Sequence, residues 1–227
     1  MPRQRDPAWD SLWDSVEAAV PEPGTALTGD RSAEPAPRPE PSAAAPGRAA
    51  AAGQSATPGR SATAGGSATA GSSGLKLIVR TDGAARGNPG PASSGAVLIE
   101  AAGPSSRRPD APPIASISEY LGVQTNNVAE YTAVVRALAL ALELGAREVE
   151  MLLDSKLIVE QLHGRWRVKD AKLIPLHAEA KARLGRLARW TATHVPRAQN
   201  KQADALCNEA IDRAQAGGPR AVVIRPK

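Results

Sequence analysis

Apolar residues follow two different periods along the C-terminal two thirds of the chain. Five short runs rich in Val, Ile and Leu are typical of strands: 76–81, 94–101, 115–123, 147–154 and 191–195. Apolar residues at helical spacing predict four helices: 127–144, 155–163, 173–188 and 199–215. Because short connections join the first three strands, we expect these to be antiparallel, and the later β-α-β steps to be parallel with right-handed crossovers. The pattern therefore predicts an α/β fold with a mixed sheet flanked by helices.

The chain before residue 75 lacks this patterning. Residues 21–74 are rich in Ala, Pro, Gly and Ser and contain the related hexapeptides SATPGR, SATAGG and SATAGS. Such a segment has too few large apolar side chains to bury a core. We expect a disordered linker there, followed by a folded domain over 75–215 and a tail over 216–227. The tail sequence AVVIRPK leaves open whether it forms an extra edge strand or lies loose.

The first 20 residues differ from the linker. Four apolar residues fall at i, i+3, i+4 and i+7: Trp9, Leu12, Trp13 and Val16. This spacing predicts a short amphipathic helix with acidic residues elsewhere around it. Residues 9–17 are therefore a candidate docking helix for a protein partner. The alternatives are a nascent helix without a partner and a helix that folds back on its own domain.

Charge is also unevenly divided along the chain. Residues 1–74 carry 6 basic and 8 acidic residues, a net charge of −2, whereas residues 75–227 carry 22 basic and 15 acidic ones, a net charge of +7. The positive excess of the folded part favours binding of a polyanion. The single cysteine, Cys207, excludes an intramolecular disulfide framework and fits a reducing compartment. Since no run has the length of a membrane span and the N-terminus lacks a signal-peptide pattern, we expect a cytoplasmic protein.

Four acidic residues are the candidates for chemistry, and three of them stand where an apolar run meets a turn or a polar helix start, so that a carboxylate has no packing purpose there. Asp82 and Asp154 each end an apolar strand run. Glu130 lies in the first turns of a predicted helix, and Asp204 lies one turn into the last helix. Each has an ordinary explanation on its own, as a turn former, a helix cap or a charge at a helix N-terminus. Together they predict a shared cation, usually Mg²⁺, and metal-assisted phosphodiester chemistry, because clustered carboxylates repel one another unless a cation lies between them.

Four motifs carry a resemblance to a known family. In order, TDGAARGNPGP, TNNVAEY, DSKLIVEQL and HVPRAQNKQADALCNEA resemble the motifs of type 1 ribonuclease H, over about 75–215. The resemblance implies a five-stranded mixed sheet of the ribonuclease H-like fold and a monomer that hydrolyses the RNA strand of RNA–DNA hybrids, leaving 3′-hydroxyl and 5′-phosphate ends. It implies two Mg²⁺ ions, with Mn²⁺ as a substitute. The metal-binding carboxylates of the family fall on Asp82, Glu130, Asp154 and Asp204.

The resemblance also implies where the hybrid is contacted. The family places contacts to 2′-hydroxyl groups and base edges at two short loops, which here contain Gly87, Asn88, Thr125, Asn126 and Asn127. Only 2′-hydroxyl contacts separate RNA from DNA at a given nucleotide. Helix capping is the alternative role for Asn126 and Asn127.

The chain departs from many family members in a loop before the last aspartate. Many members carry a histidine in that loop, but here the loop HVPRAQN is short. His194 precedes the proline and aligns with an apolar strand position, so we interpret it as structural. Arg197 takes the loop position and is the candidate for the phosphate or leaving-group role, as in members with this shorter loop. Asn200 is expected to hold Arg197 or to contact the DNA strand.

A second departure is the missing basic handle, an insertion that some members use to grip the DNA strand. Only Arg165, Trp166, Arg167 and Lys169 stand in its place. A tryptophan flanked by cations is suited to stacking on the sugar–phosphate backbone. The alternative is a buried Trp166 that anchors the junction between two helices.

Three other functions compete with hybrid cleavage. A ribonuclease-H-like nuclease with another substrate is disfavoured by the intact GNPGP and TNN motifs. A hybrid-binding module with weak or altered nuclease specificity is disfavoured because binding alone would favour neutralising the carboxylates. In the third, the N-terminal helix is the functional part and the nuclease domain is its cargo.

Overall fold

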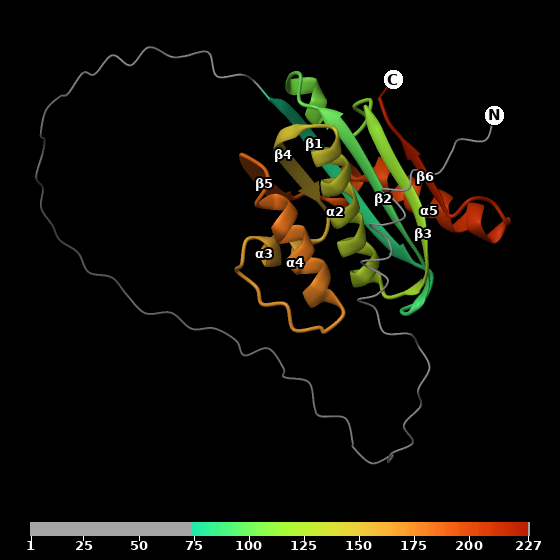
Figure 1. Ribbon diagram of the computed structural model, residues 1–227. Helices are drawn as coiled ribbons and strands as arrows, with labels where there is room; N and C mark the ends of the chain where they lie inside the picture. Colours follow the sequence, from blue (N-terminus) through green and yellow to red (C-terminus); the bar gives the residue numbers. More distant parts are fainter. Residues whose placement is uncertain (1–73, 227) are drawn as a thin grey trace, which may run out of the picture. The chain divides into compact units, whose positions relative to one another are not determined.

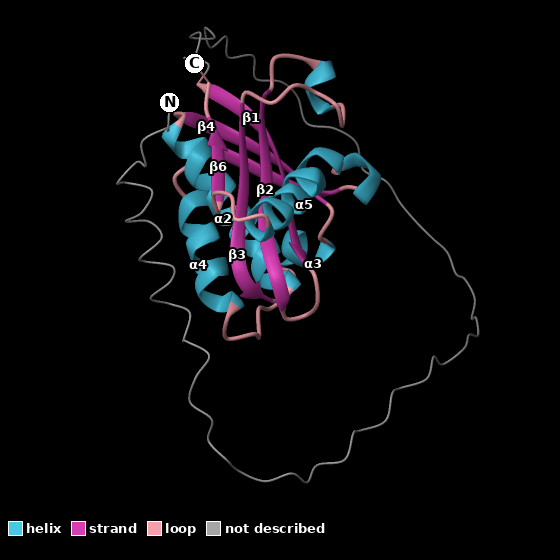
Figure 2. Cartoon of the chain, turned by 90° about the vertical axis from the view of Figure 1, so that its right-hand side faces the viewer, coloured by secondary structure: helices cyan, strands magenta, loops and turns pink. Residues whose placement is uncertain are grey.

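The apolar runs form one sheet with helices on both faces, as Figures 1 and 2 show for residues 74–226, which the computed structural model describes. The strands are β1 (Leu75–Ala85), β2 (Gly90–Glu100), β3 (Ala115–Gln124), β4 (Ala146–Leu153), β5 (Arg189–His194) and β6 (Ala221–Ile224). The helices are α2 (Asn126–Glu143), α3 (Lys156–Leu162), α4 (Leu173–Leu184) and α5 (Lys201–Gln215), with short 3-10 turns η1 (Pro104–Arg107) and η2 (Arg197–Gln199). The predicted N-terminal helix, and the predicted linker up to residue 73, lie outside the described residues.

The sheet is mixed, as the sequence predicts. Its strand order is β5-β4-β1-β2-β3-β6. The first three strands pair antiparallel, and β1–β4 and β4–β5 pair parallel. The expected count of five strands was wrong, because the C-terminal tail adds β6 antiparallel to Ser116–Glu119 of β3. This pairing satisfies backbone groups that would otherwise be open along the edge of β3.

The two faces of the sheet are covered by different elements. In Figure 2, α2 and α4 lie on one side of the sheet and α5 on the other. Alternation along β1 serves both faces: Leu77 and Val79 belong to the large apolar cluster that includes residues of α2 and α4, whereas Ile78 belongs to a second cluster. That second cluster includes Ala111, from the connection between β2 and β3. Because β1 is buried on both faces, it reads as a continuous apolar run in the sequence.

Most element boundaries differ from the predicted ones by one or two residues, and β1 differs by more, because it ends at Ala85 rather than at 81. Helix α4 ends at Leu184 rather than at 188, where Gly185 is the C-cap. Helix α5 begins at Lys201 rather than at 199, because the residues before it form the separate turn η2. Strand β2 begins at Gly90 rather than at 94, since the ladder with β1 continues as far as Ala85 and Ala92. The two helix differences result from local turns that periodicity does not register.

Within residues 74–226, no helix has both the length and the apolar character needed to cross a membrane.

Candidate active site

The carboxyl ends of two parallel strands bring the first two acidic residues together. Strands β1 and β4 are neighbours, with Thr81 paired to Leu153. Asp82 directly follows Thr81, and Asp154 directly follows Leu153. The predicted side-by-side position of these two carboxylates is therefore confirmed.

Glu130 reaches the same place from the start of α2. A Cβ at Gly83 would lie 2.0 Å from the backbone nitrogen of Glu130, so only glycine lets β1 and α2 approach this closely. The amide of Asn126 donates to Oε1 of Glu130 at 3.0 Å, and the hydroxyl of Ser155 donates to Oε2 at 2.9 Å. Both carboxylate oxygens are thus held from neighbouring elements.

Asp204 comes from the opposite layer, in the first turn of α5. This helix packs closely on β2, and Gly95 leaves room for it: a Cβ at this position would lie 2.3 Å from the carbonyl oxygen of Ala203. Oδ1 of Asp204 pairs with the guanidinium of Arg197, and Oδ2 accepts from the amide of Asn208 at 3.3 Å. The carboxylate therefore lies beside a cation that the chain itself supplies.

The acidic side chains influence one another electrostatically. Burial, together with the negative charges of Asp154 and Asp204, raises the pKa of Asp82 to about 7, against the lowering effect of Arg197. Burial also raises the pKa of Glu130, where the hydrogen bond from Ser155 opposes the shift. Asp82 and Glu130 of this carboxylate cluster therefore lie where a negative charge is costly.

A divalent cation fits the chemistry of this cluster. Oδ2 of Asp82 is buried and has no hydrogen-bond partner within the described residues, so a carboxylate oxygen is left to accept from a ligand. Carboxylate oxygens are the ligands that hard divalent cations prefer. In residues 74–226, however, no three His, Cys, Asp or Glu side chains converge as a group that could hold a metal ion as they stand. The carboxylates are thus of the kind that binds such a cation, although no three of the described ones converge at one point.

Asn200 is fully buried beneath the cluster. Its Nδ2 donates to the carbonyl oxygen of Thr81 at 2.8 Å and to Oδ1 of Asp154 at 2.9 Å. The backbone carbonyl oxygen of Asn200 accepts from the backbone N–H of Asp204 at 3.1 Å. The buried side-chain amide therefore links the end of β1 to the end of β4, and the backbone of the same residue opens α5.

Arg197 and His194 lie in or next to the loop before Asp204, and their surroundings differ. Arg197 has a side chain that is 74% exposed, and it pairs with Asp204 as described above. The hydrogen bond to Asp204 raises the pKa of Arg197, and the negative charges of Asp204, Asp82 and Asp154 add to this effect. His194 was expected at a buried apolar position of the last strand, and this was wrong. It is exposed at the end of β5, and the buried positions nearby are Ala192 and Val195.

The two predicted substrate loops lie against each other. The side-chain oxygen of Asn88 accepts from the backbone N–H of Asn126 at 3.1 Å. Gly87 has a φ of 105°, and the Asn88–Pro89 bond is cis. The N-cap of α2 is Thr125, whose hydroxyl accepts from the backbone N–H of Val128. The capping alternative for Asn126 and Asn127 is therefore wrong, and Asn127 is exposed to solvent.

Trp166 lies in the connection between α3 and α4 and is 46% exposed. The alternative of a buried anchor for this residue was therefore wrong. Its neighbour Arg165 pairs with Glu160 of α3. The structure places Trp166 on the surface of this connection rather than in the carboxylate cluster.

Two residues of the site were not singled out from the sequence. Ser155 was assigned only to the opening of a helix, yet it donates to Glu130; its place directly after Asp154 is the available signal. Arg80 interrupts the apolar run KLIVRT and is buried two residues before Asp82. A charge inside a strand that is buried on both faces is the signal in its case.

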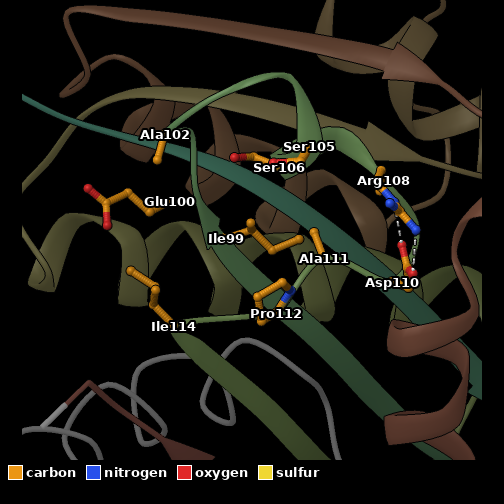
Figure 3. Close-up of a pocket in the computed structure, with 10 residues that line it drawn as sticks. All are labelled: Ile99, Glu100, Ala102, Ser105, Ser106, Arg108, Asp110, Ala111, Pro112 and Ile114. Carbon is orange, nitrogen blue, oxygen red and sulfur yellow. Dashed lines mark hydrogen bonds and ion pairs between the residues drawn. The ribbon is translucent and has the colours of Figure 1, made fainter.

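A separate hollow lies at the other end of β2 (Figure 3). It is lined by Ile99, by Ala111 and by the ion pair of Arg108 and Asp110, among others. Strand pairing sets Gly95 opposite Asp82 and Glu100 opposite Leu77, so this hollow is several residues along the sheet from the carboxylates. The hollow is therefore separate from the four carboxylates.

Fold and site together define an α/β domain with an acidic centre at the carboxyl ends of two parallel strands. Comparison with known proteins agrees with that description. The family described as reverse transcriptase-like matches residues 80–210. Ribonuclease H of a Polaromonas species is 35% identical over 159 residues, which cover 61% of this chain and 90% of that protein. By these matches the chain belongs to the ribonuclease H family, among its type 1 members.

Two further similarities concern a longer protein and a solved complex. The bifunctional protein Rv2228c of Mycobacterium tuberculosis is 42% identical over 140 residues. These cover 62% of this chain but only 36% of Rv2228c, so the chain spans about a third of that relative. The crystal structure of LC11-RNase H1 in complex with an RNA/DNA hybrid is 40% identical, with a TM-score of 0.54, and the match covers 61% of this chain and 99% of that one.

Proposed function

We propose that this chain is an endonuclease that hydrolyses the RNA strand of RNA–DNA hybrids and leaves 3′-hydroxyl and 5′-phosphate ends. One observation carries the proposal: two carboxylates lie at adjacent strand ends, and an oxygen of Asp82 is buried there without a hydrogen-bond partner among the described residues. The solved complex of a 40% identical relative with an RNA/DNA hybrid supports the substrate class.

The metal ligands in this proposal are Asp82, Glu130, Asp154 and Asp204. The ribonuclease H family generally uses divalent metal ions, and we propose two Mg²⁺ ions here, with Mn²⁺ as a substitute. When bound, such ions lower the pKa of an attacking water and stabilise the leaving 3′ oxygen. The protein keeps the ligands in place: Ser155 and Asn126 orient Glu130 through two hydrogen bonds. Because these donors are set before substrate arrives, little reorganisation is needed at the moment of reaction.

Arg197 is proposed to act on the phosphate. Its guanidinium lies beside Asp204 on an exposed side chain, so it can exchange a carboxylate partner for a phosphate oxygen without leaving solvent. Asn200 is proposed to position this region rather than to touch the substrate, because its side chain is fully buried.

Recognition of the RNA strand is proposed for the two loops that meet beside α2. Gly87 and Asn88 would contact the hybrid from one loop, and Thr125, Asn126 and Asn127 from the other. The hydrogen bond between Asn88 and the backbone of Asn126 fixes the two loops as one surface. Trp166 is proposed to stack on the sugar–phosphate of the DNA strand, which its exposure supports.

We further propose that the protein is a monomer. A location in the reducing cytoplasm is proposed as well, and the single free cysteine supports it. Residues 9–17 are proposed to be a docking helix for a protein partner, which their apolar spacing supports.

Hybrid cleavage is tested with three labelled substrates: an RNA–DNA hybrid, the same RNA single-stranded, and the same RNA in a duplex with RNA. With Mg²⁺ or Mn²⁺, the hybrid alone should be cut, and Asp82→Asn or Asp154→Asn should lower kcat by at least about 10³-fold. Asp110→Asn is the matched control, because this exposed aspartate pairs with Arg108 away from the cluster. Equal cleavage of all three substrates, or activity in EDTA, would contradict the proposal. Tight hybrid binding without cleavage would instead favour the hybrid-binding module.

A further inference from the structure

Arg80 is an unusual residue for its position. It lies on β1 and is 1% exposed, among the largest fully buried side chains of the described residues. Side chains on a strand alternate between faces, so Arg80 shares a face with Ile78 and with Asp82. Burying a guanidinium is costly, and an apolar side chain would pack there at no such cost. Its presence therefore requires a reason beyond the core.

The guanidinium binds backbone from two distant parts of the chain. Nη1 donates to the carbonyl oxygen of Gln199 at 2.7 Å, and Nη2 donates to the carbonyl oxygen of Arg107 at 2.6 Å. Gln199 ends η2, and Arg107 ends η1. The planar fork of an arginine can fix two acceptors at once, which the ammonium of a lysine cannot do in the same geometry.

The negative charge of Glu150 compensates the positive charge of Arg80 on the same face of the sheet. Burial lowers the pKa of its guanidinium, and the negative charge of Glu150 opposes that shift. Glu150 stands next to Ile78 on the neighbouring strand and pairs with Arg107 at 2.9 Å. The arrangement is thus a network, buried at Arg80 and exposed at Arg107, that joins strands β1 and β4 to both 3-10 turns.

The turn held in this way carries site residues. η2 contains Arg197, which pairs with Asp204. The residue after Gln199 is Asn200, which donates to Asp154. Fixing the carbonyl of Gln199 therefore fixes the backbone on which both of these contacts depend.

We propose that Arg80 is a positioning residue for catalysis, which holds the turn 197–199 and the following Asn200 in register with the carboxylate cluster. The inference rests on the proposed hybrid cleavage. Arg80 itself touches neither substrate nor metal ligand; it acts through the placement of Arg197 and Asn200.

The test uses the full chain with Arg80→Met, which keeps length and removes the donors, and Arg80→Lys, which keeps the charge and at least one donor. On the RNA–DNA hybrid, Arg80→Met should lower kcat about tenfold and change KM less than about twofold, since the fault lies in positioning. Arg80→Lys should recover part of the loss. In an Arg197→Ala background, the loss of kcat from Arg80→Met should be smaller than in the wild-type chain, because the part that acts through Arg197 is already gone.

The control is Ile99→Ala, a core truncation on the same face but towards the far end of β2. It should reduce stability without lowering kcat at a temperature at which the variant is folded. A wild-type kcat in folded Arg80→Met, or a tenfold loss that is unchanged in the Arg197→Ala background, overturns the proposal.

A second readout separates this inference from the proposed function. Amide hydrogen exchange of the backbone over 197–201 should accelerate in Arg80→Met, or in Arg80→Lys to a smaller degree, and not in Ile99→Ala. If the wild type does not cut hybrids, the proposed function fails while the exchange result still decides whether Arg80 holds this turn. Unchanged exchange in both Arg80 variants overturns the inference whatever the activity.

Discussion

At the scale of one residue, Asp82 shows how a site residue can lower the stability of the fold that carries it. The carboxylate is buried and is repelled by the negative charges of Asp154 and Asp204. One of its oxygens has no hydrogen-bond partner among the described residues. Its pKa is therefore raised from 3.8 to about 7. A group whose pKa is higher in the folded state binds its proton more tightly there, so deprotonation destabilises the fold.

The metal-free protein should consequently lose stability as the pH rises from about 4 to about 7, and remain less stable above that window. We predict that Asp82→Asn raises the free energy of unfolding at pH 8 by about 1–2 kcal/mol, because it removes the buried charge. Urea denaturation in EDTA at pH 5 and pH 8 measures this. Asp110→Asn should give no such gain, since pairing with Arg108 lowers the pKa of Asp110. Equal stability of wild type and Asp82→Asn at pH 8 would refute the argument.

At the scale of elements, two glycines set how closely the helices approach the sheet. Gly83 lets α2 bring Glu130 to the end of β1, and Gly95 lets α5 bring Asp204 from the opposite face. Neither glycine has a positive φ, so the requirement is space rather than backbone conformation. The acidic cluster thus depends on two close contacts between layers.

Gly95→Ala should therefore reduce the free energy of unfolding by about 2–3 kcal/mol, because the added methyl overlaps the backbone of α5. Thermal and urea unfolding measure the loss. Gly103→Ala is the control: it adds the same methyl where nothing lies within 4 Å, and its φ of 168° is extended. The control should change stability by no more than about 0.5 kcal/mol. Equal effects of the two substitutions would exclude the packing explanation.

At the scale of the molecule, the parts expected to bind nucleic acid lie in the C-terminal domain. The net charge of +7 belongs to residues 75–227, and the N-terminal 74 residues carry −2. The long-range attraction for a polyanion is therefore a property of the domain that contains the carboxylates.

Removing residues 1–73 should leave kcat/KM for the hybrid within about twofold of the full chain, with an unchanged dependence of binding on salt. The reason is that neither the carboxylates nor the positive excess is removed. Cleavage and hybrid binding are compared at several salt concentrations for both proteins. A loss of more than about tenfold would mean that the N-terminal segment takes part in binding or catalysis.

The sequence by itself determined the strand and helix order, the antiparallel and parallel parts of the sheet, and the meeting of Asp82 with Asp154. These follow from local periodicity and from the rule that parallel neighbours end at one edge of a sheet. Only the tertiary structure decided that the tail pairs with β3, that Thr125 caps α2, and that His194 is exposed. It also gave Arg80 its partners at Gln199 and Arg107. The pairing of the tail and the partners of Arg80 depend on contacts between residues distant in the chain, to which a local pattern of apolar and polar positions is insensitive.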